Sequence, residues 1–371
     1  MQKVAIIYRV IQHYRAPFFE LLSNDRNINL TVLHGPDFKN TKVVSKKNDR
    51  NFNSKKIFSI KLKYKTINGD GYMPISPFLL FELFKLKPDV IISEGASNLF
   101  NALQGFIYCR ITNKKFVWWS LGEIQNRKKS MLRRIFDRLI HFIEKNSHSI
   151  ITYSSIGMKY FLSLGIKKDK IYKALNVVDT DSVISKLNLK IKRKSPIYKS
   201  NYKFKIIFVG ALIKEKNIDN LIRAFAIMKN IDENIELIIV GDGPYKSELI
   251  KLKKHLNVKN INFVGSQFDN IDFYWRSADL FVLPGLGGLA ISEAMCYSLP
   301  ILCSIGDGCE VDLVNKKNGI IEKDMTPENI AKHIEHLIKQ DLKSMGSESL
   351  RIILERYNTK NYVRKIIESI E

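Results

Sequence analysis

A glycine-rich segment at residues 283–295 has the residue types of a phosphate-binding turn. Gly285, Gly287 and Gly288 follow an apolar run, and a helix is predicted to begin near Leu289. Glycines let the backbone approach a ligand closely, and the free N–H groups and dipole of a helix N-terminus favour an anion. The segment therefore predicts a diphosphate site, and an ordinary tight turn between strand and helix is the structural alternative.

An acidic residue lies about one turn inside this predicted helix. Glu293 falls on the same face as Leu289 and could accept hydrogen bonds from the two hydroxyls of a ribose. A glutamate exposed to solvent on an ordinary helix is the structural alternative.

Two further segments place a glycine at the end of an apolar run. The first contains Gly210, Ala211 and a polar loop with Lys216, whose ammonium group could point at the same phosphate. Taken alone this pattern is weak, because a lysine in such a loop is usually solvated. In the second, residues 238–244, the run ends at Gly241, and a Gly-Asp-Gly turn is the simpler interpretation.

Short apolar runs alternate with helical segments in both halves of the chain, which is typical of buried parallel strands in α/β domains. A length of 371 residues exceeds one ordinary domain, so we expect two. The predicted fold is two Rossmann-like doubly wound domains facing across a cleft. The expected division is a first domain at 1–180, a basic linker at 181–203, a second domain at 204–350, and a C-terminal helix at 351–371 crossing back to the first domain.

The expected elements follow from these runs. Strands are predicted at 4–8, 28–33, 90–92, 116–119, 149–153, 205–209, 236–240, 262–264, 280–283 and 300–303, and helices around 18–22, at 218–228 and 247–255, near 289, and from 327 onward. Residues 38–70 are lysine-rich and fit either a strand pair or a mobile loop.

Together these segments resemble the donor-binding domain of retaining glycosyltransferases with the GT-B fold, in glycosyltransferase family 4 (glycosyl transferases group 1). The resemblance covers roughly residues 150–365, and the motifs that carry it are residues 153–179, 210–217, 241–244, 262–265 and 278–300. It implies an acceptor-binding first domain and a second domain that binds a nucleoside-diphosphate (NDP) sugar. UDP or GDP is the expected nucleotide, and no other cofactor is expected.

The resemblance also implies roles for single residues. Lys216 would contact the nucleotide diphosphate and Glu293 would hold the ribose, and these are the two residues we expect to be catalytic. The N–H groups of Gly288 and Leu289 would hold phosphate oxygens. The full predicted donor-binding set is Gly210, Ala211, Lys216, Gly241, Ser266, Gln267, Gly285, Gly287, Gly288, Leu289, Ala290 and Glu293, with Ser266 and Gln267 near the nucleobase.

The chain departs from the family pattern at two positions. Ala211 stands where the family commonly has arginine, so one phosphate-binding cation is missing. Gly285 stands where the family has the first of two glutamates, the one that usually contacts the donor sugar. We interpret the chain as an active subgroup with a glycine-rich version of this loop.

The amino-terminal half resembles the family less. His13, Arg15, Glu94 and Glu123 all follow predicted strands, so each could point into the expected cleft. We expect Arg15 to replace the missing phosphate cation and Glu94 and Glu123 to touch acceptor hydroxyls. A purely structural role is the alternative for each of them.

No metal is expected in the reaction. Asp179-Thr180-Asp181 has the Asp-x-Asp spacing of a metal site, but the resemblance places an aspartate there as part of the hinge. Cations and helix N–H groups would stabilise the leaving diphosphate instead.

The net charge of +23 requires an anionic partner to be considered. Residues 1–180 contain 31 basic and 13 acidic side chains, a net of +18 that leaves +5 for the remainder. The apolar segment 78–85 and the basic segment 127–138 suggest an anionic membrane surface, with a core helix and a solvated helix as the alternatives. The sequence shows no nucleic-acid-binding motif.

The four cysteines form no CxxC pair, which favours reduced thiols in a cytoplasmic protein. No signal-peptide core and no apolar run of spanning length occurs in the sequence. We therefore expect a cytoplasmic protein, peripheral on the inner face of the membrane.

The predicted function is transfer of a sugar from an NDP-sugar to a saccharide acceptor, lipid-linked, in surface polysaccharide assembly. A nucleotide-sugar epimerase of the same fold and a basic nucleic-acid-binding protein remain as alternatives.

Overall fold

The computed structural model describes residues 1–12, 14–36, 51–66, 69–122, 131–193, 195–228, 234–267 and 270–371, without the side chains of 63–66, 69–72 and 131–135. The chain divides into two compact units. Unit 1 consists of Met1–Leu175 and Lys360–Glu371, and unit 2 is Asn176–Thr359. The boundaries therefore lie at 175/176 and 359/360, where the sequence suggested 180/181 and 350/351.

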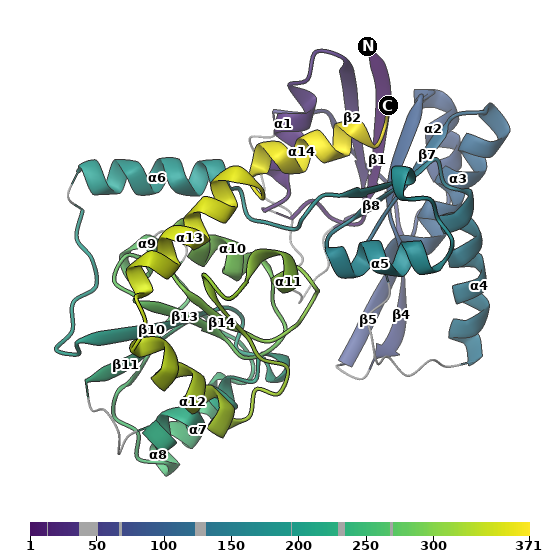
Figure 1. Cartoon of the computed structure of the whole chain (residues 1–371). Coiled ribbons are helices and arrows are strands. Elements are labelled where there is room, and N and C mark those ends of the chain that lie inside the picture. The colour runs from purple at the N-terminus through teal and green to yellow at the C-terminus, as the bar shows by residue number, and fades with distance from the viewer. Residues whose placement is uncertain are drawn as a thin grey trace. The chain divides into compact units, whose positions relative to one another are not determined.

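Unit 1 is built on a parallel seven-stranded sheet in the order β3-β2-β1-β6-β7-β8-β9 (Figure 1). Its strands are β1 (Gln2–Tyr8), β2 (Ile28–His34), β3 (Ser54–Lys56), β6 (Val90–Glu94), β7 (Lys115–Ser120), β8 (Ser149–Thr152) and β9 (Ile171–Lys173). Every residue of β6 and β8 is buried, which explains why apolar residues occur consecutively in them, at Val90–Ile92 and at Ile150 and Ile151. The order reverses between β1 and β6, so ligands are expected beyond the carboxyl ends of those two strands.

The helices of unit 1 cover this sheet, and a separate antiparallel hairpin accompanies them. The helices are α1 (Ala16–Ser23), α2 (Leu79–Leu86), α3 (Leu99–Thr112), α4 (Met131–Asn146), α5 (Ser155–Ser163) and α14 (Thr359–Glu368), with 3-10 turns at Ala96–Asn98 and Lys168–Lys170. The hairpin strands are β4 (Ile60–Thr66) and β5 (Gly69–Ile75). The strand-pair interpretation of the lysine-rich stretch is thus confirmed for its described part, and residues 38–50 lie outside the described residues.

The C-terminal helix α14 packs within unit 1. Tyr362 is buried, contacts Phe18 with ring centroids 4.4 Å apart, and accepts a hydrogen bond of 2.7 Å from the Arg15 guanidinium. The main chain at the end of the protein adds two contacts, since Ser149 donates to the Ser369 carbonyl and Lys115 to the Ile370 carbonyl. Residues 360–371 are therefore part of the core of unit 1.

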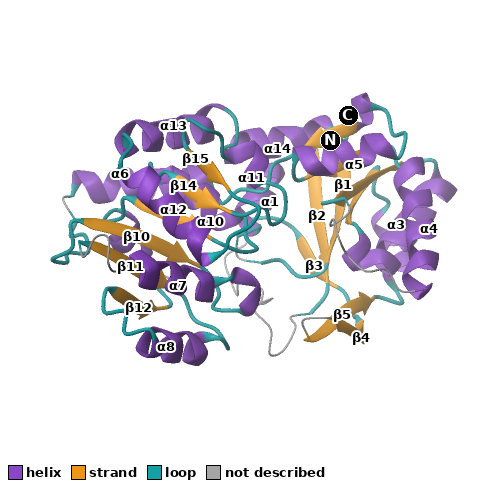
Figure 2. Cartoon of the chain, turned by 60° about the horizontal axis from the view of Figure 1, so that its bottom comes forward, coloured by secondary structure: helices purple, strands orange, loops and turns teal. Residues whose placement is uncertain are grey.

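Unit 2 contains a parallel six-stranded sheet in the order β12-β11-β10-β13-β14-β15 (Figure 2). The strands are β10 (Phe204–Val209), β11 (Ile235–Val240), β12 (Ile261–Gly265), β13 (Leu280–Leu283), β14 (Ile301–Cys303) and β15 (Gly319–Ile321). Numbered within the unit, the order is 3-2-1-4-5-6, the arrangement of dinucleotide-binding folds. The predicted fold class, two Rossmann-like doubly wound domains, is confirmed.

The helices of unit 2 form two groups, and the helices within each group contact one another. The first group is α7, α8 and α12, and the second is α6, α10, α11 and α13. Their bounds are α6 (Thr180–Lys192), α7 (Ile218–Met228), α8 (Lys246–His255), α10 (Leu289–Cys296), α11 (Glu310–Leu313), α12 (Pro327–Ile338) and α13 (Leu342–Glu355), with a short α9 (Ile271–Trp275) and a 3-10 turn at Lys214–Lys216. Right-handed crossovers on either side of the reversal put such groups on opposite faces of the sheet.

The sequence predicted a linker at residues 181–203. In the structure the first half of this stretch belongs to a helix, α6. Asp179 caps α6 by accepting a hydrogen bond of 3.2 Å from the Ser182 N–H, and it also accepts one from the Thr359 hydroxyl. The lysines of this helix, at 186, 190 and 192, make its second half strongly basic, so the stretch had the composition of a linker and the helix was not predicted.

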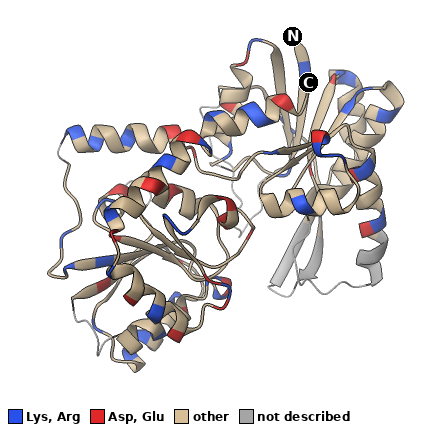
Figure 3. Ribbon diagram, in the orientation of Figure 1, with Lys and Arg blue, Asp and Glu red and all other residues tan. Residues whose placement is uncertain are grey.

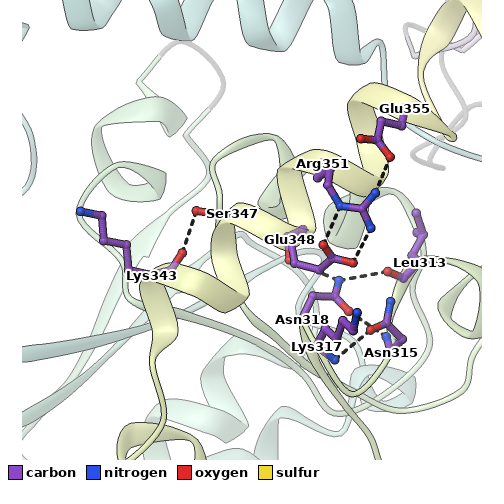
Figure 4. Close-up of polar contacts among 10 residues, drawn as sticks. Leu313, Asn315, Lys317, Asn318, Lys343, Ser347, Glu348, Arg351 and Glu355 are labelled. Atoms are coloured by element: carbon purple, nitrogen blue, oxygen red, sulfur yellow. Dashed lines mark hydrogen bonds and ion pairs between the residues drawn. The ribbon is translucent and has the colours of Figure 1, made fainter.

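The loop between α11 and β15 is fixed by its own side chains (Figure 4). Asn318 is buried and donates a 3.1 Å hydrogen bond to the Leu313 carbonyl, while the N–H of Lys317 donates to the Asn315 side chain at 2.8 Å. On α13, Arg351 bridges Glu348 and Glu355. The contacts of Asn315 and Asn318 fix the loop that leads into β15, the neighbour of β14, whose following loop enters the site described below.

Candidate functional site

Two loops meet beyond the carboxyl ends of β10 and β13, where the strand order of unit 2 reverses. The N–H of Leu286 donates to the Glu215 carbonyl at 2.9 Å, and the Asn217 amide donates to the Pro284 carbonyl at 3.4 Å. A Cβ at Gly285 would collide with the main chain of Glu215 and Lys216. Glycine is therefore required at 285, and a glutamate cannot replace it without moving both loops.

Lys216 reaches across from the first loop to the second. Its ammonium group donates to the Leu286 carbonyl and lies beside Gly287, where a Cβ would come within 2.9 Å of the ammonium nitrogen. Gly210, directly after β10, lies against the same side chain, since a Cβ added at this glycine would be 3.8 Å from Cε of Lys216. The positive charge is thus held over the glycine turn that precedes α10.

The N-terminus of α10 is open to an anion. Gly288 is its N-cap, no side chain caps the helix, and its first turn contains no acidic residue. The N–H groups of Leu289 and Ala290 belong to the first turn and have no intrahelical acceptor. Together with Lys216, these groups and the helix dipole form a site for a diphosphate.

Glu293 lies one turn further along α10. It is half-buried, and its Oε1 accepts a hydrogen bond of 3.2 Å from the Trp275 indole N–H. Burial raises the pKa of this carboxyl group, and the Trp275 hydrogen bond and the charge of Lys186 act in the opposite direction. A carboxylate fixed by an indole on one side retains free lone pairs for the hydroxyls of a ribose.

The remaining predicted donor residues line neighbouring strand ends. A Cβ at Gly241 would collide with the Gly210 carbonyl, and the Gly241 N–H donates to the Gly265 carbonyl at 2.9 Å. Gln267 donates to the Val264 carbonyl at 2.8 Å, and Ser266 beside it is exposed. The turns after β10, β11 and β12 therefore adjoin one another, and Ala211 lies in the first of them, directly after Gly210.

A third loop, residues 304–309 after β14, was not predicted. A Cβ at Gly288 would collide with the Asp307 carboxylate, so this loop lies against the start of α10. Glu310 follows it, fully buried, and accepts a hydrogen bond of 2.9 Å from the Gly308 N–H. The sequence signal was present in the two acidic residues and glycines of Gly306-Asp307-Gly308-Cys309-Glu310, the segment directly after a predicted strand.

No group of three or more acidic, histidine or cysteine side chains that could hold a metal ion occurs among the described residues. Asp179, from the Asp-x-Asp pattern, caps α6 as described above. The four cysteines are free and buried. Within the described part of the chain, no helix is long and apolar enough to cross a membrane.

Residues 190–358 match the glycosyl transferases group 1 family. Over 307 residues, 77% of this chain and 76% of the relative, the protein is 28% identical to an uncharacterized glycosyltransferase of Methanocaldococcus jannaschii. The chain therefore contains, at residues 190–358, a domain of the glycosyl transferases group 1 family. It is a glycosyltransferase, and this membership favours the transferase over the epimerase and nucleic-acid-binding alternatives.

Two further similarities extend this result. The glycosyltransferase is 30% identical over 179 residues to the capsular polysaccharide biosynthesis glycosyltransferase CapM of Staphylococcus aureus, covering 46% of this chain and 44% of CapM. Its fold matches the crystal structure of Anabaena HepE in complex with UDP with a TM-score of 0.72 at 17% identity, covering 100% of this chain and 99% of HepE. The second similarity shows the shared fold.

Unit 1 of the glycosyltransferase has its own pair of polar groups at a reversal of strand order. Glu94, at the end of β6, is buried and accepts hydrogen bonds from Arg9 after β1, at 2.6 Å from the backbone N–H and 3.3 Å from Nε. The charge of Glu94 raises the pKa of Arg9. Arg9 is half-exposed and was not predicted as a site residue. His13 and Glu123, which were, lie outside the described residues.

Arg15 differs from our prediction. Its side chain is 3% exposed, donates to Tyr362, and lies within 6 Å of several aromatic rings, including those of Trp119 and Tyr153. A guanidinium enclosed by rings gains cation–π stabilisation but does not face solvent. The surroundings of Arg15 thus indicate a structural cation that holds α14, and the expected role as a phosphate-binding cation is not supported.

Glu310 gives the glycosyltransferase a predicted pH dependence of stability. Burial and the nearby charge of Asp307 raise the pKa of Glu310 from 4.5 to about 7. The folded state therefore holds an extra proton between these values, and its stability falls as the pH rises from about 4.5 to 7, by on the order of 3 kcal/mol. Glu310→Gln should remove this slope, measured as the free energy of unfolding at pH 5 and pH 8.

The matched control is Glu248→Gln on α8, which removes a solvent-exposed carboxylate from the same unit. Its slope should equal that of the unchanged protein. An unchanged slope in Glu310→Gln would show that Glu310 titrates with its ordinary pKa in the folded state.

Proposed function

We propose that this glycosyltransferase transfers a sugar from an NDP-sugar to a saccharide acceptor, with retention of anomeric configuration and without a metal ion. The observation that carries this proposal is the pairing of Lys216 with the uncapped N-terminus of α10 at the strand reversal of unit 2. A cation and free N–H groups arranged in this way match a diphosphate. Glu293, one turn away, matches the ribose attached to it.

The chemistry follows from where negative charge develops. When the bond between the sugar C1 and the diphosphate oxygen breaks, its electron pair stays with the diphosphate. Lys216 and the N–H groups of Leu289 and Ala290 stabilise that charge, and they do so without reorganising because the two loops are already locked together. The acceptor hydroxyl then forms the new bond to C1, and its proton goes to the departing diphosphate oxygen. Retention is an implication of the resemblance to retaining family members.

UDP is the nucleotide we propose for the donor. HepE, which shares the fold over its full length, has been crystallised with UDP and with UDP-glucose. The predicted nucleobase region, Ser266 and Gln267 after β12, offers a hydroxyl and an amide for hydrogen bonds to a base edge.

The proposed acceptor is a lipid-linked saccharide used in surface polysaccharide assembly, as the similarity to CapM supports. Arg9 and Glu94 of unit 1 are the candidate acceptor contacts, because a half-exposed guanidinium paired with a carboxylate presents donors and acceptors to sugar hydroxyls. Arg9 follows β1 and Glu94 is the last residue of β6, so both lie at the carboxyl ends of these strands, the ligand position for this strand order.

A membrane-facing surface fits such an acceptor. On α2, Leu79 and Leu83 are buried in the core while Phe81 is 69% exposed, and Phe78 before the helix is 63% exposed. Ile111 on the adjacent α3 is exposed as well. α2 and α3 contain one basic residue each, Lys85 and Arg110, and the described side chains of α4 include Arg138 and Lys145 (Figure 3). Residues 127–130 of the predicted basic segment lie outside the described residues.

Apolar anchorage combined with positive charge favours an anionic lipid surface. The protein should therefore float with vesicles of phosphatidylglycerol and phosphatidylcholine and remain unbound with phosphatidylcholine alone. Replacing Phe81 by serine should lower the partition coefficient about 10- to 150-fold, because burying a phenylalanine contributes roughly 1.5–3 kcal/mol. Leu354→Ser, at an exposed apolar position of unit 2, is the control. Equal flotation of both variants would contradict a role for α2.

Thermal unfolding with UDP, GDP, dTDP, ADP and CMP, each with and without magnesium, tests the proposed function. A ligand at 100 times its dissociation constant stabilises the folded state by about 2.7 kcal/mol. We expect UDP to stabilise the protein, and to do so without magnesium. If no nucleoside diphosphate raises the melting temperature, the proposed function is wrong.

A further inference from the structure

Position 285 leaves the donor site without a carboxylate that the family pattern would supply. The collision described above shows that no side chain fits there while Glu215 and Lys216 keep their places. If the donor sugar is held by a carboxylate, another element must provide it.

The loop after β14 has a carboxylate, that of Asp307, near this position. β14 pairs with β13, so the loops that follow them are neighbours, and the Asp307 carboxylate packs against the Cα of Gly288, at the N-terminus of α10. Its Oδ1 accepts a hydrogen bond of 3.1 Å from the Cys309 N–H. Burial raises the pKa of Asp307, while the charge of Lys216 lowers it, so the two groups share one electrostatic environment.

Glu310 gives this loop its shape. The side chain is fully buried, and its Oε2 accepts the Gly308 N–H while Oε1 has no hydrogen-bond partner among the described residues. At Gly306, a Cβ would come within 2.9 Å of both Oε1 of Glu310 and the Gly287 nitrogen, so the loop fits closely between them. A buried polar atom without a partner is unusual in folded proteins, where a bound water, strain or a functional role accounts for such atoms.

The position of Asp307 determines which part of an NDP-sugar can lie next to its carboxylate. A diphosphate on the N–H groups of Leu289 and Ala290 is negative, and a carboxylate beside it would repel phosphate oxygens. The sugar attached to that diphosphate carries hydroxyl groups, which donate to a carboxylate. The group that faces Asp307 is therefore the sugar.

We propose that Asp307 accepts hydrogen bonds from hydroxyls of the donor sugar, and so supplies the carboxylate that position 285 cannot hold. This proposal rests on the proposed function, because it takes the NDP-sugar as the ligand. Asp307 is then a residue that determines which sugar is accepted. Glu310 is a positioning residue that acts through the loop.

Asp307→Asn is the test, since asparagine keeps an oxygen for the Cys309 N–H while removing the charge. Calorimetric titration should give an affinity for UDP within about 3-fold of the unchanged protein, and an affinity for the UDP-sugar lower by about 10-fold, as expected for a lost hydrogen bond to a charged group. The control, Asp312→Asn on α11, removes one charge from the next helix and should change neither affinity.

Two results would overturn the proposal: an unchanged ratio of UDP-sugar to UDP affinity in Asp307→Asn, or an equal loss of both affinities, which would place Asp307 at the phosphates. A second measurement needs no variant. The unchanged protein should bind at least one UDP-sugar that lacks a single hydroxyl about 10-fold more weakly than the parent donor, and equal affinity for all of them would overturn the proposal. Failure of the unchanged protein to bind UDP at all would instead contradict the proposed function.

Discussion

Replacing Lys216 by alanine should weaken the binding of UDP by about 10- to 150-fold, corresponding to 1.5–3 kcal/mol for a hydrogen bond involving a charged group. The loss in kcat/KM should be larger, about 100- to 1,000-fold, because the ammonium group also stabilises the charge that develops on the leaving diphosphate. The geometry behind this expectation is the contact of Lys216 with the Leu286 carbonyl and with Gly287. Calorimetry and a coupled assay of UDP release measure the two effects.

Lys214→Ala is the matched control for this variant. It removes the same charge from the same 3-10 turn, but the Lys214 ammonium lies over the Tyr245 ring, 5.6 Å from its centroid. UDP affinity in this control should stay within about 3-fold of the unchanged protein, as for an exposed charge. Equal losses in both variants would mean that Lys216 contributes only to the general positive potential.

Replacing Glu293 by alanine should also weaken UDP binding by about 1.5–3 kcal/mol. The physical reason is the loss of a carboxylate that Trp275 holds in place and that has free lone pairs for the ribose hydroxyls. Calorimetric titration of both proteins with UDP measures the difference, and thermal unfolding without ligand reports any loss of packing around the substitution.

The ligand offers a sharper control than a second variant. A uridine diphosphate whose ribose lacks both the 2′- and 3′-hydroxyls should bind the unchanged protein and Glu293→Ala with equal affinity, because the partner of the carboxylate is gone. If the variant binds this analogue more weakly than the unchanged protein does, Glu293 acts on the shape of the site and does not contact the ribose.

Much of the fold was predictable because the strands are buried on both faces. The run 280–283 is apolar throughout and the run 236–240 is apolar after Glu236, and they lie within one residue of β13 and β11. The glycines of 285–288 and the helix after them were equally visible, since no other residue type fits where two loops touch.

The parts that sequence reasoning missed depend on contacts between distant segments. Arg15 resembles an exposed cation in the sequence, and only the packing of α14, more than 340 residues later, buries it against Tyr362. Asp307 looks like a turn residue, and its meaning appears only when β14 places its loop beside Gly288. Residue type indicates what a group can do, whereas the strand order determines which groups meet.

The domain boundaries show the same limit at a smaller scale. The basic stretch predicted to be a linker contains α6, whose start is set by the Asp179 cap and by hydrogen bonds between Thr180 and Thr359. Those two threonines lie 179 residues apart in the chain. The composition indicated a polar surface segment. It could not show that the segment is a helix or that contacts with a distant residue fix the start of that helix.

The central claim is that a nucleoside diphosphate binds at the N-terminus of α10 in unit 2. Hydrogen–deuterium exchange of the full protein with and without UDP tests it most directly. We predict slower exchange in peptides that cover residues 284–296 and 205–217, where the N–H groups and Lys216 lie, and unchanged exchange along β4 and β5 of unit 1. Protection that leaves 284–296 unchanged while UDP is bound would contradict the account.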